Sequence, residues 1–301
     1  MQRPAKPFTP VRFRIQPPNI MKIGIIGYGF VGKALANGLN NTLDVCIIDP
    51  KLGTTIKNLY KFKPEIIFIC LPTPMKSDGT QEISLIKDTI EKIKKFSISG
   101  IIVIKSTVHP GNINEIKKIC PDFVYNPEFL REKHAKEDFI NSELIIFGGD
   151  KEKSILLSKF YTDYTKCVNT QHIFTDETTA SMIKYTINAF LATKVIFFNE
   201  INNIFESTDA RETWKNFTKY VSQDKRIGNS HMMVPGHDGR LGFGGACLPK
   251  DIAALVKYAQ SNDIQLNLIK NVIKTNNKIR ASYNSNTDRE NDQNIKYNTE
   301  E

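Results

Sequence analysis

Cys247 lies in the segment GFGGACLPKD, residues 242–251, whose residue types could support nucleophilic chemistry. Pro249 favours the first turn of a helix, which places Cys247 just before the N-terminus of that helix. The positive end of a helix dipole and its free N–H groups lower the pKa of a thiol at this position. Asp251 follows in the first turn, near enough to share the site. Taken alone, a single cysteine beside a glycine-rich loop is more often buried and inert.

Two further pairs of polar residues, each four positions apart, could act with this thiol. Lys184 and Asn188 share one face of a predicted helix, where an ammonium and an amide can hold an oxygen atom or a water. Glu128 and Glu132 follow directly after a predicted strand, where doubly wound folds bind ligands. Each pair also has a structural explanation, as an exposed Lys–Asn pair or as charge at a helix N-terminus.

A glycine-rich turn near the beginning of the chain predicts a dinucleotide site. The glycines of G-x-G-x-x-G allow a tight turn, close approach of a pyrophosphate and close packing of helix on strand. An acidic residue that ends the second predicted strand can bind a ribose diol, which favours NAD over NADP. A turn without a ligand is the alternative. The predicted cofactor contacts are Gly27, Tyr28, Gly29, Phe30, Val31, Gly32 and Asp49.

Short apolar runs alternate with amphipathic stretches over the first part of the chain, which predicts an α/β, Rossmann-like doubly wound parallel sheet. The two clearest helical stretches are Lys33–Leu39 and Leu85–Lys95. The predicted strands are Lys22–Ile26, Val45–Ile48, Ile66–Cys70, Ile101–Ile104, Phe123–Tyr125 and Leu144–Phe147.

Beyond the sheet, residues 178–205 contain neither Gly nor Pro and place apolar residues at helical spacing. They predict one long helix with more apolar surface than a lone helix can expose, which favours pairing with a second subunit. Further helices are expected at about 249–260 and 266–279. The expected units are a disordered extension at 1–20, an NAD-binding domain at 21–175, an all-α central dimerisation domain at 176–280 and a disordered tail at 281–301.

Composition limits the classes of function. The net charge of +9 is spread along the chain without a recognisable nucleic-acid module, and no apolar run is long enough for a membrane span. Neither a nucleic-acid nor a membrane partner is therefore expected. The five cysteines show neither a disulfide framework nor a zinc spacing, so no metal is expected and a cytoplasmic setting is favoured.

The motifs together resemble the UDP-glucose/GDP-mannose dehydrogenase family, most closely its members that act on UDP-glucose. The matching stretches are GYGFVGKAL, CLPTPMKSDGT, IKSTVHPG, YNPEFLRE, MIKYTINAFLATKVIFFNEI, DKRIG and GFGGACLPKD. The resemblance implies oxidation of the C6 alcohol of the sugar to a carboxylate with two NAD, through a thioester on Cys247. GDP-mannose is the nearest competing substrate. Relatives that act on N-acetylmannosamine nucleotides typically carry His where this chain has Ala246.

The resemblance also implies roles for individual residues. Lys184 and Asn188 would stabilise an oxyanion, Asp251 and Lys184 would take up the proton of the alcohol, and Glu128 would activate water that Thr107 positions. The implied cofactor contacts are Leu71, Pro72, Thr73, Pro74, Ser106 and Glu132. The implied substrate contacts are Glu128, Phe129, Leu130, Arg131, Lys184, Asn188, Phe243, Gly244, Gly245 and Arg226, the last reaching the sugar nucleotide of a partner subunit in a homodimer.

The resemblance ends near Arg280, before the C-terminal domain that closes over the nucleotide in the family. Two functions therefore stay open. The chain is either a compact dehydrogenase, alone or completed by another polypeptide, or a truncated, dimerising NAD-binding remnant without turnover. The joint presence of Cys247, Lys184, Asn188, Glu128 and Asp251 favours the enzyme, since an idle site should lose such residues one by one.

Overall fold

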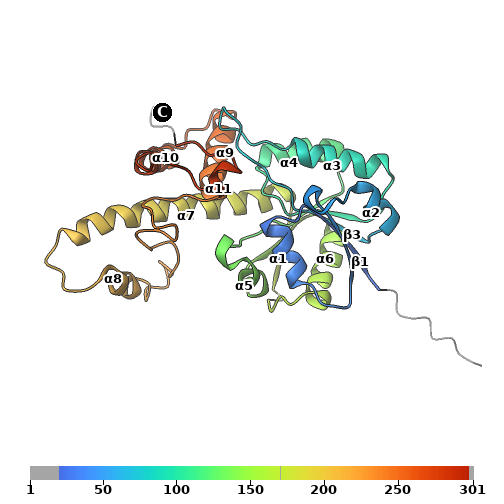
Figure 1. Ribbon diagram of the computed structural model, residues 1–301, viewed down its shortest axis with the longest axis horizontal. Helices are drawn as coiled ribbons and strands as arrows, with labels where there is room; N and C mark the ends of the chain where they lie inside the picture. The colour runs from blue at the N-terminus through green and yellow to red at the C-terminus, as the bar shows by residue number, and fades with distance from the viewer. Residues whose placement is uncertain (1–19, 170, 298–301) are drawn as a thin grey trace, which may run out of the picture.

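The computed structural model describes residues 20–169 and 171–297, and it shows an α/β domain followed by a helical domain (Figure 1). The predicted fold class is confirmed. All six predicted strands are present, and a short seventh strand joins the sheet after them. The strands are β1 (Lys22–Ile26), β2 (Asp44–Ile48), β3 (Ile66–Ile69), β4 (Ile101–Ile104), β5 (Val124–Tyr125), β6 (Ile145–Gly149) and β7 (His172–Thr175).

The strands form one sheet in the order β2-β1-β3-β4-β5-β6-β7. All neighbours are parallel except β5 and β6, which pair antiparallel. The chain moves outward from β1 to β2 and then returns to β3 on the other side of β1, so the strand order reverses between β1 and β3. In such sheets the ligand crevice lies beyond the carboxyl ends of the strands at this reversal.

Both faces of the sheet are covered, which explains why its strands are almost wholly apolar. Ile67, Ile69 and Ile104 pack against α2 (Ile56–Phe62), α3 (Ser84–Lys95) and α4 (Pro110–Ile119). The alternate residues Ile66, Phe68 and Val103 point to the opposite face. There they pack against α1 (Phe30–Gly38), α5 (Ala135–Ile140) and α6 (Lys151–Tyr164) (Figure 1).

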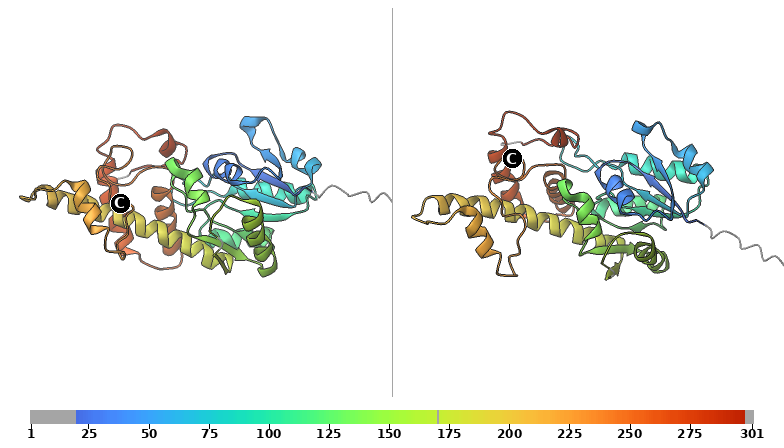
Figure 2. Two further views of the ribbon diagram at one scale, coloured as in Figure 1. Left: turned by 90° about the horizontal axis from the view of Figure 1, so that it is seen from below. Right: turned by 60° about the horizontal axis from the view of Figure 1, so that its bottom comes forward.

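The long predicted helix is confirmed as α7 (Glu177–Glu206), which leaves the sheet and runs the length of the helical domain (Figure 2). It begins where the side chain of Asp176 accepts a hydrogen bond from Thr179 N at 2.8 Å. The helices α9 (Leu248–Gln260) and α10 (Asn267–Arg280) pack against it through an apolar core that contains Tyr185, Ile252 and Val272. At its far end α8 (Trp214–Val221) packs through Trp214 against Phe205.

The predicted disordered tail is wrong for residues 281–297, which fold back onto the helical domain. A short helix, α11 (Asp288–Asn291), begins at a capping box formed by Thr287 and Glu290. The side chain of Glu290 is fully buried, and Ile295 is 3% exposed. Buried polar contacts rather than an apolar run hold this segment in place, so its polar composition suggested disorder. Residues 298–301 and 1–19 lie outside the described residues.

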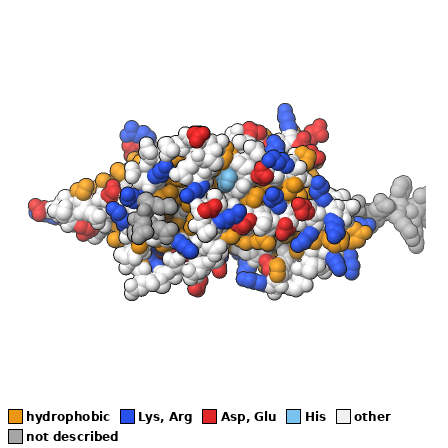
Figure 3. Space-filling view, turned by 90° about the horizontal axis from the view of Figure 1, so that it is seen from above, with side chains coloured by type: hydrophobic (Ala, Val, Ile, Leu, Met, Phe, Trp, Pro, Cys, Tyr) orange, Lys and Arg blue, Asp and Glu red, His pale blue; other side chains and the backbone are white. Residues whose placement is uncertain are grey.

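The face drawn in Figure 3 fits the expectation of scattered charge. On the face drawn in Figure 3, Lys and Arg side chains are dispersed among Asp and Glu and form no continuous stripe. No helix within the described ranges is long and apolar enough to cross a membrane. All five cysteines are free. Across residues 20–169 and 171–297, no group of three or more His, Cys, Asp or Glu side chains could hold a metal ion.

Candidate active site

The glycine-rich turn joins β1 to α1 at the crevice of the sheet. Gly27 has φ +90°, a conformation that glycine adopts without strain. Gly29 precedes the first residue of α1, and no side chain caps the helix there, so its first N–H groups are available to an anion. A Cβ atom on Gly29 would meet nothing within 4 Å, whereas one on Gly32 would lie 2.0 Å from Gly27 O. Gly29 thus leaves room for a ligand, and Gly32 allows the helix to pack.

The predicted acidic residue stands beside this turn. Asp49 follows β2, and its Oδ2 accepts a hydrogen bond from Tyr28 N at 2.7 Å while Oδ1 accepts from Lys51 N at 2.9 Å. The carboxylate is half-buried and retains lone pairs for the hydroxyls of a ribose. A pyrophosphate at the helix N-terminus and a ribose at Asp49 are the two ends of an adenosine diphosphate, so these residues fit NAD.

The other predicted cofactor contacts form the wall of the crevice after β3 and β4. Ser106 Oγ donates to Leu71 O at 2.7 Å, and Thr73 Oγ1 donates to Thr107 O at 3.0 Å. Thr107 O also accepts from the buried side chain of Gln81 at 2.9 Å. These bonds hold the Leu71–Pro74 turn against the end of β4. The side chain of Glu132 lies outside the described part of the structure.

A buried ion pair joins α7 to the end of β5. Lys184 Nζ donates to Glu128 O at 2.6 Å and to Glu128 Oε1 at 3.3 Å, and both side chains are 4% exposed. The ammonium also lies 5.2 Å from the centre of the Phe129 ring. Glu128 Oε2 accepts from Leu130 N at 2.7 Å. The predicted substrate segment is thus folded around Lys184, except that Arg131 turns outward to pair with Asp138.

A second polar chain crosses from α7 to α9. Asn188 Nδ2 donates to Asp251 Oδ2 at 2.7 Å, and Lys250 Nζ binds Asp251 Oδ1. Asp251 is 1% exposed. Burial alone would lower the pKa of Lys250, but the adjacent Asp251 carboxylate raises it above its ordinary value. The charge of Asp251 is therefore compensated, and Asn188 keeps a second N–H for another acceptor.

Cys247 is the residue before α9, as the sequence predicts, but its predicted low pKa is wrong. The side chain is half-buried, and burial raises the pKa of the thiol to about 12. The carboxylates of Glu128 and Asp251 raise it further, while the ammonium groups of Lys250 and Lys184 act in the opposite direction. All four charged groups therefore act on this sulfur, which the structure brings together with both polar chains.

Two predicted substrate contacts, Arg226 and Phe243, do not join the polar residues around Lys184 and Asp251. Arg226 is on the loop after α8, with its side chain 88% exposed, and pairs with Asp224. The side chain of Phe243 is buried in the core of the helical domain. Phe243 also lines a cavity of about 630 Å³ between the loop at 75–79, α9, α10 and residues 295–297, which none of the predicted catalytic residues lines. Gly244 and Gly245 lie on the loop that leads to Cys247.

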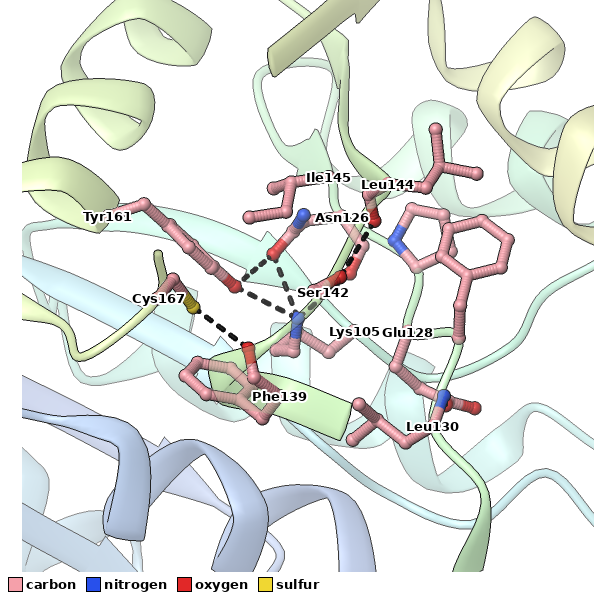
Figure 4. A pocket seen from close by; sticks show the side chains of 12 residues that line it. Lys105, Asn126, Glu128, Leu130, Phe139, Ser142, Leu144, Ile145, Tyr161 and Cys167 are labelled. Carbon is pink, nitrogen blue, oxygen red and sulfur yellow. Dashed lines mark hydrogen bonds between the residues drawn. The ribbon is translucent and has the colours of Figure 1, made fainter. Parts of the chain in front are cut away.

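A buried polar cluster that shares a small cavity with Glu128 was not predicted. Lys105 Nζ donates to Asn126 Oδ1 at 2.9 Å and to Tyr161 OH at 3.0 Å, and Figure 4 shows these three side chains pointing toward one another. The adjoining cavity is only about 20 Å³, roughly the room for one water. Burial lowers the pKa of Lys105. The available signal was a lysine directly after the apolar run Ile101–Ile104.

Comparison with known families adds to this geometry. The model of the UDP-glucose/GDP-mannose dehydrogenase family, NAD binding domain, matches residues 50–165. The model of the central domain of the same family matches residues 178–278. The cofactor of this chain is accordingly NAD, in agreement with the turn at Gly27 and the carboxylate at Asp49.

Individual relatives agree with the family models. The chain is similar to the UDP-glucose 6-dehydrogenase of Rickettsia bellii (strain RML369-C), with 38% identity over 70% of this chain and 49% of that protein. It is also similar to UDP-glucose 6-dehydrogenase YwqF of Bacillus subtilis (strain 168), with 36% identity over 72% of this chain and 49% of that protein. The chain thus spans about half the length of these curated relatives.

A solved structure shares the fold. A UDP-glucose dehydrogenase from the hyperthermophilic archaeon Pyrobaculum islandicum superimposes with a TM-score of 0.70 at 23% identity, over 88% of this chain and 70% of that chain.

Substitution by alanine should distinguish the role of Gly29 in binding the cofactor from the role of Gly32 in packing the helix. Gly32→Ala should lower the free energy of unfolding by about 1–3 kcal/mol, because the new methyl group collides with Gly27 O. Gly29→Ala should change stability by less than about 0.5 kcal/mol but weaken NAD binding about tenfold or more, because the methyl group stands where the pyrophosphate approaches. Urea unfolding and calorimetric NAD titration measure both effects. Wild-type NAD affinity in Gly29→Ala would contradict this assignment.

The buried cluster should stabilise the fold. Lys105→Met should lower the free energy of unfolding by about 1–3 kcal/mol, because Asn126 O and Tyr161 OH lose a buried donor. Lys95→Met, at an exposed position on α3, is the matched control and should leave stability unchanged. Equal urea midpoints for the two variants would show that the cluster contributes nothing.

Proposed function

The chain belongs to the UDP-glucose/GDP-mannose dehydrogenase family, and from this premise we propose that it oxidises UDP-glucose at C6 to UDP-glucuronate. The reaction takes one alcohol, two NAD and one water to one carboxylate, two NADH and three protons. The observation that carries the proposal is that one helix, α7, pairs Lys184 with Glu128 and Asn188 with Asp251, and that Asp251 lies in the first turn of the helix that Cys247 precedes. Such a set suits capture of an aldehyde by a nucleophile.

The first oxidation requires removal of the proton of the alcohol. The turn at Gly27–Gly32 and the carboxylate of Asp49 would hold NAD, which would supply the hydride acceptor for both oxidations. The carboxylate of Asp251 takes up the proton through a water, while Lys184 and Asn188 donate to the substrate oxygen. Because Lys184 and Asn188 lie one helical turn apart on α7, both donors approach that oxygen from one side.

Capture of the aldehyde requires the thiol of Cys247. Because the pKa of the thiol is raised, the resting group is neutral, and its proton must leave as the S–C bond forms. The carboxylates of Glu128 and Asp251 are nearby acceptors for this proton, and Lys184 and Asn188 stabilise the negative oxygen. The second oxidation converts the thiohemiacetal to a thioester.

Hydrolysis completes the reaction. Glu128 activates a water that attacks the thioester carbonyl, the C–S bond breaks and the thiol is regenerated. Thr107 positions that water. Lys184 holds the Glu128 carboxylate in place, because it binds both Oε1 and the backbone oxygen of the same residue. Two contacts to one residue restrict both its backbone and its side chain.

UDP-glucose is favoured as the sugar nucleotide over GDP-mannose. Both curated relatives above are named as UDP-glucose 6-dehydrogenases. The small side chain of Ala246, which is 6% exposed, stands beside Cys247. The resemblance described from the sequence implies a larger histidine at this position in relatives that act on N-acetylmannosamine nucleotides.

A homodimer is the proposed assembly. Phe190, Phe197 and Ile204 are 61%, 53% and 62% exposed on α7 and are spaced seven residues apart. This spacing places them on one stripe of the helix, which is the pattern of a helix that packs against a second one. A second copy of α7 would remove this apolar stripe from water, and Arg226 would then be available to the partner subunit.

The substrate proposal predicts two NADH per UDP-glucose. GDP-mannose and UDP-N-acetylmannosamine, measured alongside by absorbance at the NADH band, should yield less than about a tenth of the rate. Cys247→Ala should abolish uronate formation, since no thioester can form. Absence of NADH from a protein that still binds NAD would contradict the proposal and favour a cofactor-binding chain without turnover.

The assembly proposal predicts a dimer in sedimentation velocity at micromolar concentration. Phe197→Glu should shift the protein to monomer, because a charge would be buried in the paired stripe. Asn203→Glu, at an exposed polar position on the same helix, should remain dimeric. A monomeric wild-type protein at this concentration would refute the assembly.

A further inference from the structure

Residues 288–297 return from α10 to the loop that carries Cys247. Glu290, on α11, is fully buried, and its Oε1 accepts a hydrogen bond from Gly245 N at 3.2 Å. Gly245 lies two residues before Cys247. The same Oε1 accepts from Arg280 Nη2 at 2.8 Å and from the hydroxyl of Tyr297. One carboxylate oxygen thus joins three parts of the chain beside the candidate nucleophile.

Arg280 extends this network along the loop. Its Nη2 donates to Asp238 Oδ2 at 2.7 Å and its Nη1 to Leu241 O at 3.4 Å, while its own side chain is wholly buried. The neighbouring Asn276 of α10 accepts from Phe243 N at 2.7 Å. The loop from 238 to 245 is therefore held by side chains at several points rather than by regular secondary structure.

The loop has little space in which to rearrange. A Cβ atom on Gly244 would lie 1.9 Å from Arg280 Nη2 and 2.4 Å from Glu290 Oε1. Only glycine lets the backbone approach the ion pair this closely. Burial alone would raise the pKa of Glu290, but hydrogen bonds from Tyr297, Thr287 N and Arg280 lower it to about 2. Glu290 is therefore a carboxylate at neutral pH.

The same segment contacts the cofactor side of the crevice. Met75 N donates to Gln293 O at 3.1 Å. Met75 directly follows the Leu71–Pro74 turn, which Ser106 and Thr107 hold against the sheet. Residues 290–293 therefore link the loop of Cys247 to the α/β domain. The family match of the central domain ends at residue 278, so these contacts come from a part of the chain outside that match.

We propose that Glu290 is a positioning residue that, through its bond to Gly245 N, fixes the loop of Cys247 and so holds the half-buried thiol in its place before α9. The proposal predicts a change in the conformation of the loop and a loss of turnover. Only the loss of turnover rests on the proposed function. A test that reads the thiol directly therefore distinguishes failure of the one from failure of the other.

The test is alkylation of Cys247 by iodoacetamide at pH 8 in protein without substrate, followed by mass spectrometry of the individual cysteine peptides. Cys46 serves as the internal reference. It is also half-buried, and it lies on β2, the edge strand of the sheet, away from the helical domain that contains the loop. In Glu290→Gln the charge that binds Arg280 is lost and the loop loosens. Alkylation of Cys247 relative to Cys46 should become about tenfold faster, the size expected for loss of a charged hydrogen bond.

Two further variants serve as a matched control and as a milder disruption of the same network. Asp292→Asn, at an exposed residue that pairs with Arg289 on α11, should leave the alkylation ratio unchanged. Tyr297→Phe removes only one hydroxyl from Glu290 and should accelerate alkylation in the same direction by a smaller factor, even if Glu290→Gln does not fold. The proposal is overturned if Tyr297→Phe and any folded Glu290→Gln keep the wild-type ratio, or if Asp292→Asn raises it equally.

Turnover gives a second readout. In the variants that loosen the loop, kcat with UDP-glucose should fall while the KM for NAD stays near the wild-type value, because the glycine-rich turn at Gly27 is untouched. A parallel fall of thermal stability without any change in alkylation or in kcat would show a purely structural segment and would overturn the proposal.

Discussion

A charge that is buried away from water must be paired, and this requirement governs how the two domains meet. Lys184 comes from the long helix and Glu128 from the end of β5, and neither side chain could stay buried without the other. Their pairing fixes the height and rotation of α7 relative to the sheet. Once α7 is placed, Asn188 one turn further on meets Asp251 of α9. The helix that carries Cys247 is therefore positioned through the same helix that contacts the crevice.

The thiol shows how burial competes with the helix terminus. A helix N-terminus is worth about 0.3–1 kcal/mol to a nearby anion, which corresponds to less than about one pKa unit. Burial of Cys247 has a larger effect and raises the pKa to about 12. The motif correctly indicated the position of Cys247 before α9 but could not reveal how much water the surrounding side chains exclude. A thiol that stays neutral is also less reactive toward oxidants than a thiolate.

What could be predicted from the sequence depended on the kind of contact involved. Buried strands appear as apolar runs, so β1, β3 and β4 were predicted to within a residue. The strand β7 was missed because it is a short edge strand, with Ile173 and Phe174 about half exposed. The pairing of Lys184 with Glu128 joins residues 56 positions apart, and helical spacing brought only Lys184 and Asn188 together. Lys105 was missed because a single lysine directly after an apolar run is only a weak signal that its side chain is buried.

The segment after α10 was wrongly predicted to be disordered, again because contacts between distant polar residues leave no pattern in the sequence. Its composition indicates disorder because it lacks apolar periodicity, yet Glu290 and Arg280 are buried there and pair with each other. Hydrogen bonds from Gly245 N, Thr287 N and Tyr297 compensate the desolvation of Glu290, so the segment is ordered by specific polar contacts. Removing one partner of such a pair costs roughly 3–5 kcal/mol, because the other charge is left buried. Order around Cys247 therefore depends on charge pairing in two places, between Lys184 and Glu128 at α7 and between Arg280 and Glu290 near the end of the described chain.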